Sequence, residues 1–166
     1  MMSSVEFKPP EVSHAPQISR LVRETPKLDH NSEYIYALWC AYFARNSAVA
    51  VNGDEVLAFV TGFRSPASPE VYFLWQTAAK SRHGIPNLGV DLIQYAAERE
   101  IASGARIVEA SVDAKNKPMT ILMKTLCKRL GGDLETEVLF DSETLSANGT
   151  QHHEETLYRI RLRDRG

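Results

Sequence analysis

Apolar positions recur along the chain with two periods, one typical of helices and one typical of strands. In the first periodic segment Ile18, Leu21 and Val22 fall on one face of a helix, and Ser13 is its candidate N-cap. In the second, an i, i+3/i+4 stripe is rich in aromatic residues. Glycines end the two later segments, as at many helix C-termini. The predicted helices are 15–23, 32–46, 88–103 and 120–130.

Between these segments the pattern predicts strands. Asn52, Gly53 and Asp54 form a hairpin turn signal between two apolar runs. The predicted strands are 47–51, 55–63, 71–79, 106–112, 134–139 and 156–162. The order α-α-β-β-β-α-β-α-β-β predicts an α+β fold with a mixed sheet flanked by helices. We expect a single domain over residues 15–163, preceded by a flexible N-terminus at 1–14.

Composition narrows the possible partners. The chain has 166 residues, 43% of them hydrophobic, which is enough for one self-sufficient core. Its 19 Lys and Arg are balanced by 21 Asp and Glu without a basic run, so we expect a small-molecule partner rather than nucleic acid or a membrane. Cys40 and Cys127 lack metal-ligand spacing and lie in apolar helical patterns, so we expect core thiols and no metal. No N-terminal apolar run resembles a signal segment, which favours the cytoplasm.

One connection between a strand and a helix is rich in turn residues. The apolar strand at 71–79 leads into the sequence Gly84-Ile85-Pro86-Asn87-Leu88-Gly89 and then into the helix at 88–103. Free backbone N–H groups and the positive end of a helix dipole meet at such a point, where an anionic cofactor would dock. An ordinary strand-to-helix connection is the alternative interpretation.

Several motifs in one order carry a resemblance to a known family. They are the segment 28–34 (Leu-Asp-His-Asn-Ser-Glu-Tyr), 58–63, Pro66 to Pro69, 73–76 (Phe-Leu-Trp-Gln), Asn116 and 152–160. With the element order, they resemble the Gcn5-related N-acetyltransferase (GNAT) superfamily and, within it, the diaminobutyrate acetyltransferases of ectoine biosynthesis. The resemblance covers roughly residues 15–162.

The resemblance implies a reaction as well as a fold. The fold would be a mostly antiparallel sheet with splayed central strands. The reaction would be direct transfer of acetyl from acetyl-CoA to the γ-amine of L-2,4-diaminobutyrate, in a cytoplasmic homodimer. Two alternatives stay open: an acetyltransferase for another diamine or amino acid, and a degenerate acyl-CoA-binding module without turnover.

The resemblance also assigns the cofactor site. The implied cofactor-binding residues are Gln76, Thr77, Ala78, Ala79, Gly84, Ile85, Asn87, Leu88, Gly89 and Asn116. The turn departs from the superfamily pattern Arg-Gly-x-Gly-Leu-Gly/Ala, because the arginine is missing and Pro86 has entered. Asn87 must then adopt the backbone that a glycine normally supplies. Arg82 or His83 is a candidate replacement for the lost charge, and the alternative is that both are solvated loop residues.

For the amine substrate, the implied binding residues are Asp29, Asn31, Tyr34, Trp75 and Glu155. Helix capping is the alternative explanation for Asp29 and Asn31. Trp75 is implied to wall the substrate pocket, although a strand tryptophan can be plain core. A backbone N–H near Trp75 or Gln76 is expected to stabilise the oxyanion of the reaction.

For proton removal, Glu155 is the first candidate as general base. A carboxylate in a partly dry pocket has a raised pKa, which suits that role. Glu154 is the alternative, because strand alternation turns only one of these neighbours inward. His152 is a base, an orienting partner or an exposed loop histidine. Met123 occupies the place of the tyrosine that protonates the leaving thiolate in many superfamily members, so thiolate departure would rely on solvent.

Overall fold

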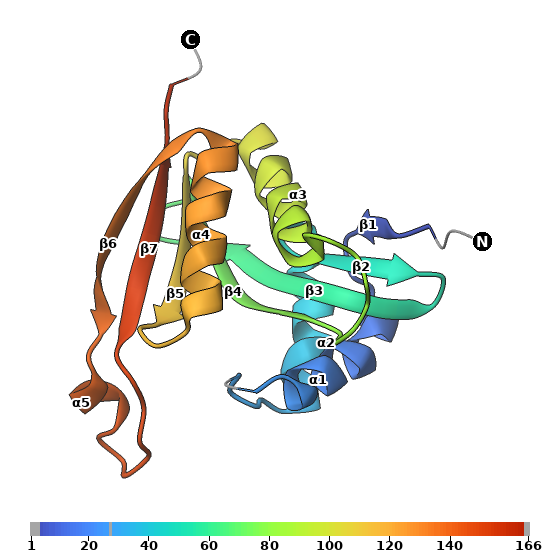
Figure 1. Cartoon of the computed structure of the whole chain (residues 1–166), viewed down its shortest axis with the longest axis horizontal. Coiled ribbons are helices and arrows are strands. Elements are labelled where there is room, and N and C mark those ends of the chain that lie inside the picture. The colour runs from blue at the N-terminus through green and yellow to red at the C-terminus, as the bar shows by residue number, and fades with distance from the viewer. Residues whose placement is uncertain (1–3, 27, 165–166) are drawn as a thin grey trace.

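A twisted seven-stranded sheet runs through the computed structural model, which describes residues 4–26 and 28–164 (Figure 1). Its strand order is β1-β2-β3-β4-β5-β7-β6, and only the β4–β5 pair is parallel. The strands are β1 (Glu6–Lys8), β2 (Ala48–Asn52), β3 (Glu55–Arg64), β4 (Val71–Ala79), β5 (Ile107–Asp113), β6 (Gly132–Phe140) and β7 (Glu155–Leu162).

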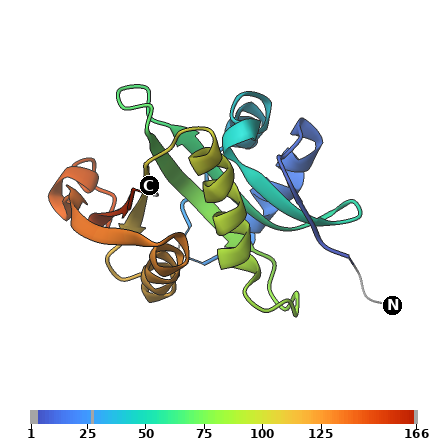
Figure 2. The ribbon, with the colours of Figure 1, turned by 90° about the horizontal axis from the view of Figure 1, so that it is seen from above.

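Helices cover both faces of the sheet (Figure 2). Helices α3 and α4 pack on one face over a core that spans β2 to β5 and β7, and α1 and α2 pack on the other face over β2, β3 and β4. The helices are α1 (Ala15–Glu24), α2 (Glu33–Tyr42), α3 (Leu88–Ala102), α4 (Lys117–Leu130) and the short α5 (Ser142–Leu145), with 3₁₀ turns η1 (Val12–His14) and η2 (Ala44–Asn46). None of the helices in the described ranges has the length and apolar content needed to span a bilayer.

The structure confirms the predicted helices and strands to within a few residues at their ends, and it confirms the α+β fold class, but the N-cap of α1 is His14 and not Ser13, which lies in η1. Residues 6–8, inside the segment expected to be flexible, form the edge strand β1, and Phe7 packs edge-on against Tyr95 with ring centroids 5.7 Å apart. One apolar residue in a three-residue strand leaves no periodicity to detect. The second predicted helix ends at Tyr42 and continues only as the turn η2, and the polar loop after β6 contains α5.

The central strand β4 changes its pairing halfway along its length. It pairs with β3 from Tyr72 to Ala79, but its parallel pairing with β5 stops at Leu74. The β3–β4 register also skips Trp75, because Thr61 faces Gln76 while Gly62 faces Leu74. A β-bulge of this kind re-aims side chains and bends the strand. The predicted splay of the central strands is therefore present, and it opens between β4 and β5.

Charged side chains cover the face of β5, β7 and β6 that is turned away from α4. Arg159 on β7 bonds Glu109 on β5 at 2.9 Å and Glu137 on β6 at 3.0 Å. Arg161 bonds Glu135 at 2.6 Å, one step along the same two strands. Because the Arg159 and Glu109 side chains are only 21% and 15% exposed, this pair of the ladder is screened less by salt than a free surface pair.

Candidate active site

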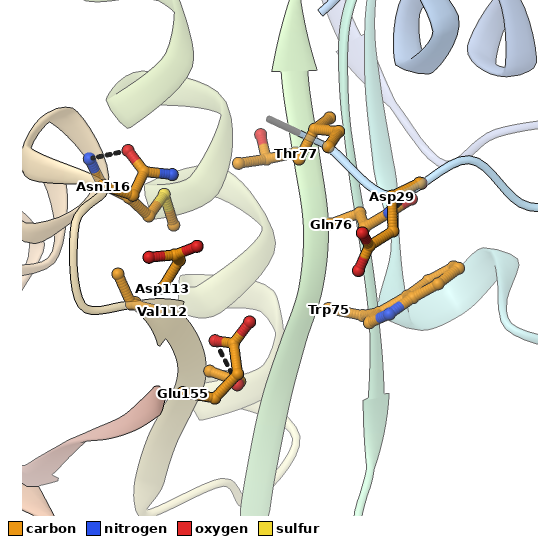
Figure 3. Close-up of a pocket in the computed structure, with 11 residues that line it drawn as sticks. Asp29, Trp75, Gln76, Thr77, Val112, Asp113, Asn116 and Glu155 are labelled. Carbon is orange, nitrogen blue, oxygen red and sulfur yellow. Dashed lines mark hydrogen bonds between the residues drawn. The ribbon is translucent and has the colours of Figure 1, made fainter. Parts of the chain in front are cut away.

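A cavity of about 170 Å³ opens where β4 and β5 separate (Figure 3). One wall comes from β4 and the other from β5 and the first residue of β7. A second hollow of about 150 Å³ adjoins it and is bordered by the loop before β7. The two hollows share three carboxylates, Asp29, Asp113 and Glu155. In Figure 3 these side chains approach the gap from both walls.

Trp75 forms the β4 wall of the cavity. The bulge turns its ring toward α2, where it stacks on Trp39 with ring centroids 4.6 Å apart and on Tyr36 at 6.1 Å. Trp39 is held in turn by a hydrogen bond from its indole N–H to the Gly62 carbonyl at 3.1 Å. Trp75 therefore does both things that the sequence allowed. One part of its side chain packs against the aromatic residues of α2, and another part lines the cavity.

A buried hydrogen-bond network fixes the loop that carries Asp29. The Tyr36 hydroxyl donates to Gln76 Oε1 at 2.8 Å, and Gln76 Nε2 donates to the Asp29 carbonyl at 3.1 Å. Asn31 Nδ2 donates to the Tyr36 hydroxyl at 3.3 Å. The Gln76 N–H donates to Thr61 Oγ1 at 3.1 Å, so of the two N–H groups named for the oxyanion this one is already bonded to β3. Gln76 instead serves as the link between β4 and the Asp29 loop.

Of the five residues predicted to bind the amine, three line the cavity, namely Asp29, Trp75 and Glu155. Asp29 lines both hollows, with its side chain 78% exposed at their mouth. Ser32, not Asp29, is the N-cap residue of α2, which argues against the capping interpretation of Asp29. Asn31 contributes to the Tyr36 network, and Tyr34 is 70% exposed and lies outside the cavity lining.

Glu155 begins β7 and points into the cavity. Its Oε2 accepts a hydrogen bond from Ser111 Oγ at 3.0 Å, and its side chain is 19% exposed. Burial raises the pKa of Glu155, and the neighbouring charges of Asp113 and Asp29 add to that effect against the opposing Ser111 bond and His152. Glu154 lines neither hollow, and its carbonyl accepts from the backbone of Ala114. The sequence did not decide which of Glu154 and Glu155 points inward, and in the structure it is Glu155.

His152 connects the two sides of the site. Its Nε2 lies 3.5 Å from Asp29 Oδ2 and 3.9 Å from Glu155 Oε1, while Nδ1 is 2.7 Å from the His153 carbonyl oxygen. That backbone hydrogen bond does most to raise the pKa of His152; burial opposes it, and the Asp29 and Glu155 carboxylates add to the rise. The alternative of an isolated loop histidine does not fit, because this side chain bridges two carboxylates.

Asp113 is a cavity residue that the sequence analysis missed. It is the last residue of β5, and the antiparallel register places it opposite Glu155. Its Oδ1 accepts the Lys115 N–H at 2.8 Å, and its Oδ2 lies 3.0 Å from His153 Nδ1. Partial burial works to raise the pKa of Asp113, but these two hydrogen bonds outweigh it, so the pKa lies below its usual value. The only sequence signal was an acidic residue at the end of a predicted strand.

The turn before α3 has the strained backbone that the sequence predicted. Asn87 has φ +61° and takes the left-handed conformation expected of a glycine substitute, directly before the first helical residue. Arg82 (φ +58°) and Gly84 (φ +74°) also lie in that region. His83 Nδ1 accepts the Ile85 N–H at 2.9 Å, so this histidine occupies one of the turn's backbone donors.

The other predicted cofactor residues fall into two groups. Thr77, Ala78 and Ala79 remain paired with β3 but have no pairing with β5, so their β5 side borders the opening. Side chains elsewhere are committed to the fold. Leu88 is 2% exposed in the core, and Asn116 Oδ1 caps α4 by accepting the Met119 N–H at 3.2 Å while still lining the cavity.

Three residues considered for other chemistry are buried in the core. Met123 is fully buried in α4. Cys40 and Cys127 are buried free thiols, as predicted, and burial raises the pKa of Cys40 to about 11. Both are therefore protonated near neutral pH and unsuited to nucleophilic attack. Across residues 4–26 and 28–164, no group of three or more His, Cys, Asp or Glu side chains is placed to hold a metal ion.

Solved structures define the class of this fold. The acetyltransferase of the GNAT family from Streptococcus pneumoniae superposes with a TM-score of 0.68 at 14% identity, covering 96% of this chain and 100% of that one. The diaminobutyrate acetyltransferase EctA from Paenibacillus lautus, in complex with its substrate L-2,4-diaminobutyric acid and coenzyme A, gives a TM-score of 0.90 at 27% identity, with 99% and 100% covered. The fold is that of the GNAT acetyltransferases.

Sequence relatives narrow the class further. L-2,4-diaminobutyric acid acetyltransferase from Streptomyces coelicolor is 33% identical over 160 residues, which cover 95% of this chain and 93% of the relative. The enzyme of the same name from Streptomyces anulatus is 37% identical over 158 residues, with 91% and 86% covered. The chain matches no protein-family model. On these identities, the chain belongs to the L-2,4-diaminobutyric acid acetyltransferase family.

Proposed function

We propose that this protein transfers an acetyl group from acetyl-CoA to the γ-amine of L-2,4-diaminobutyrate, as a homodimer in the cytoplasm. One observation carries the proposal. A cavity opens where β4 leaves β5, with a tryptophan wall on one side and two carboxylates on the other. The match to relatives of this activity over more than nine tenths of the chain supports it.

The residues present fit the cosubstrate. The side of β4 that β5 leaves uncovered at 77–79 suits the amide-rich pantetheine arm, and the α3 N-terminus after Asn87 suits the pyrophosphate. When bound there, acetyl-CoA would supply the thioester whose acetyl group is transferred. His83 must release the Ile85 N–H before that donor can serve a phosphate, and Arg82 is a candidate for the compensating charge.

The acidic side chains of the site suit a cationic amine substrate that must lose a proton. An amine that is mostly ammonium near neutral pH must lose a proton before it can attack a carbonyl carbon. Glu155, with its raised pKa, is the proposed general base, and Ser111 orients its carboxylate. Asp29 at the mouth attracts the cationic substrate, and His152 positions both carboxylates from the loop before β7. Attack is direct, so no nucleophilic side chain is needed.

Mass analysis of the product formed from acetyl-CoA and L-2,4-diaminobutyrate tests the proposal. We expect a single N-γ-acetyl product, and α-acetylation or no product would refute it. A panel of other diamines and amino acids tests the alternative substrate. Coenzyme A binding without turnover of any amine would instead identify a binding module. Size-exclusion chromatography with light scattering tests the homodimer.

The role of Glu155 needs a test of its own. Glu155→Gln keeps the shape of the side chain and its bond from Ser111, but it removes the base. We expect kcat to fall by roughly 10²–10⁴-fold with little change in KM for the amine. Glu154→Gln is the matched control on the adjacent residue, and a larger loss in that variant would reverse the assignment.

A further inference from the structure

One cavity-lining carboxylate has no part in the reaction as proposed. Asp113 faces Glu155 directly across the antiparallel β5–β7 pair, and both side chains border the cavity drawn in Figure 3 as well as the adjoining hollow. Residues paired in this way hold their Cβ atoms about 4.5–5.5 Å apart. Two carboxylates on neighbouring strands are therefore close enough to contact the same ligand.

The surroundings of Asp113 keep it charged. Each of its oxygens already has one hydrogen-bond partner, the Lys115 N–H at 2.8 Å and His153 Nδ1 at 3.0 Å, and a carboxylate can accept about four such bonds. Its side chain is 29% exposed, so it is open to the cavity.

The local charge is unbalanced without a ligand. Like charges directly opposite on neighbouring strands destabilise a sheet. Among the described residues that line the two hollows, none is an arginine or a lysine, and the histidines are the only side chains able to carry positive charge. A ligand that brought two positive charges would relieve the repulsion between Asp113 and Glu155.

Building on the proposed function, we propose that Asp113 determines specificity for a diamine by binding the ammonium group that is not acetylated, while Glu155 takes the proton from the reacting amine. The two nitrogens of diaminobutyrate are separated by three carbons, roughly 5 Å in an extended chain. That spacing matches two facing side chains on paired strands. The second charge of the substrate thereby becomes a requirement for tight binding.

Asp113→Asn tests this role, because asparagine keeps the shape and can still accept the Lys115 N–H. The two amines to compare are diaminobutyrate and 4-aminobutyrate, which has the same chain and carboxylate but lacks the second amine. For the variant we expect KM for diaminobutyrate to rise about tenfold or more, as for the loss of a charged hydrogen bond. The constants for acetyl-CoA and for 4-aminobutyrate, as substrate or as inhibitor, should change less than twofold.

The controls separate the possible failures. Glu143→Gln makes the same change of charge on the exposed helix α5 and should leave both amines unaffected. An equal loss for both amines, or no loss for diaminobutyrate, would overturn the role of Asp113. If the unaltered enzyme does not acetylate diaminobutyrate at all, the proposed function itself fails. The melting temperature of Asp113→Asn without ligand should fall, because the lowered pKa of Asp113 means that its charge stabilises the fold, so the comparison of the two amines carries the test.

Discussion

The hydroxyl of Tyr36 offers a sharp test of how the Asp29 loop is held. Tyr36 is 1% exposed, and its hydroxyl donates to Gln76 Oε1 and accepts from Asn31. Tyr36→Phe would leave the Gln76 oxygen, which is also buried, without its donor. A buried polar group left unpaired costs about 1–3 kcal/mol of unfolding free energy. In a domain of this size, each kcal/mol lowers the melting temperature by about 2–4 °C.

The same variant should affect one substrate more than the other. Gln76 Nε2 holds the Asp29 carbonyl, so a loosened Gln76 should raise KM for the amine and leave KM for acetyl-CoA unchanged. Urea unfolding and steady-state kinetics measure the two effects. Tyr42→Phe is the matched control, because Tyr42 lies on the same helix and is 77% exposed. If Tyr36→Phe were as stable as Tyr42→Phe and kept its amine KM, the network would not fix the loop.

Three further predictions concern the base, the bulge and the turn. Because the folded-state pKa of Glu155 lies above its ordinary 4.5, the folded protein binds that proton more tightly than the unfolded chain. Stability should fall as the pH rises from about 4.5 through the folded pKa, and urea melts of Glu155→Gln should lack this component. Gly62→Ala places a Cβ 2.6 Å from the Tyr72 hydroxyl and should cost about 1–3 kcal/mol or more in thermal unfolding. Asn87→Ala should cost about 1 kcal/mol and weaken coenzyme A binding in a calorimetric titration, and Asn87→Gly should keep both.

Local chemistry explains which parts of the fold could be predicted. The hairpin at Gly53 (φ +61°) and the turn residue Asn87 were predicted because few residues tolerate the left-handed backbone those positions require. The long helices and strands were predicted because their buried faces repeat with a regular period. Strand β1 could not be predicted from the sequence. Its stability comes from pairing with β2 and from the contact between Phe7 and Tyr95, and these partners are far from β1 in the sequence.

The site was predictable only where a motif marked it. Asp29, Trp75 and Glu155 were named from the family resemblance, and all three line the cavity. Asp113 joins them through the register of β5 with β7, which the sequence does not reveal. Of the two backbone N–H groups named for the oxyanion, that of Gln76 is already bonded to Thr61 on the neighbouring strand. Tertiary pairing, not local sequence, decided both outcomes.

The charged ladder described on β5, β7 and β6 also protects the end of the sheet. Strand β6 is an outer strand, and such strands can recruit foreign chains into extended aggregates. Asp133, Glu135 and Glu137 alternate along it, and their arginine partners lie on β7 or beyond it. Two copies of β6 aligned side by side would oppose acid to acid. The homodimer proposed for this chain should therefore form through another surface, leaving this edge as a barrier to uncontrolled growth of the sheet.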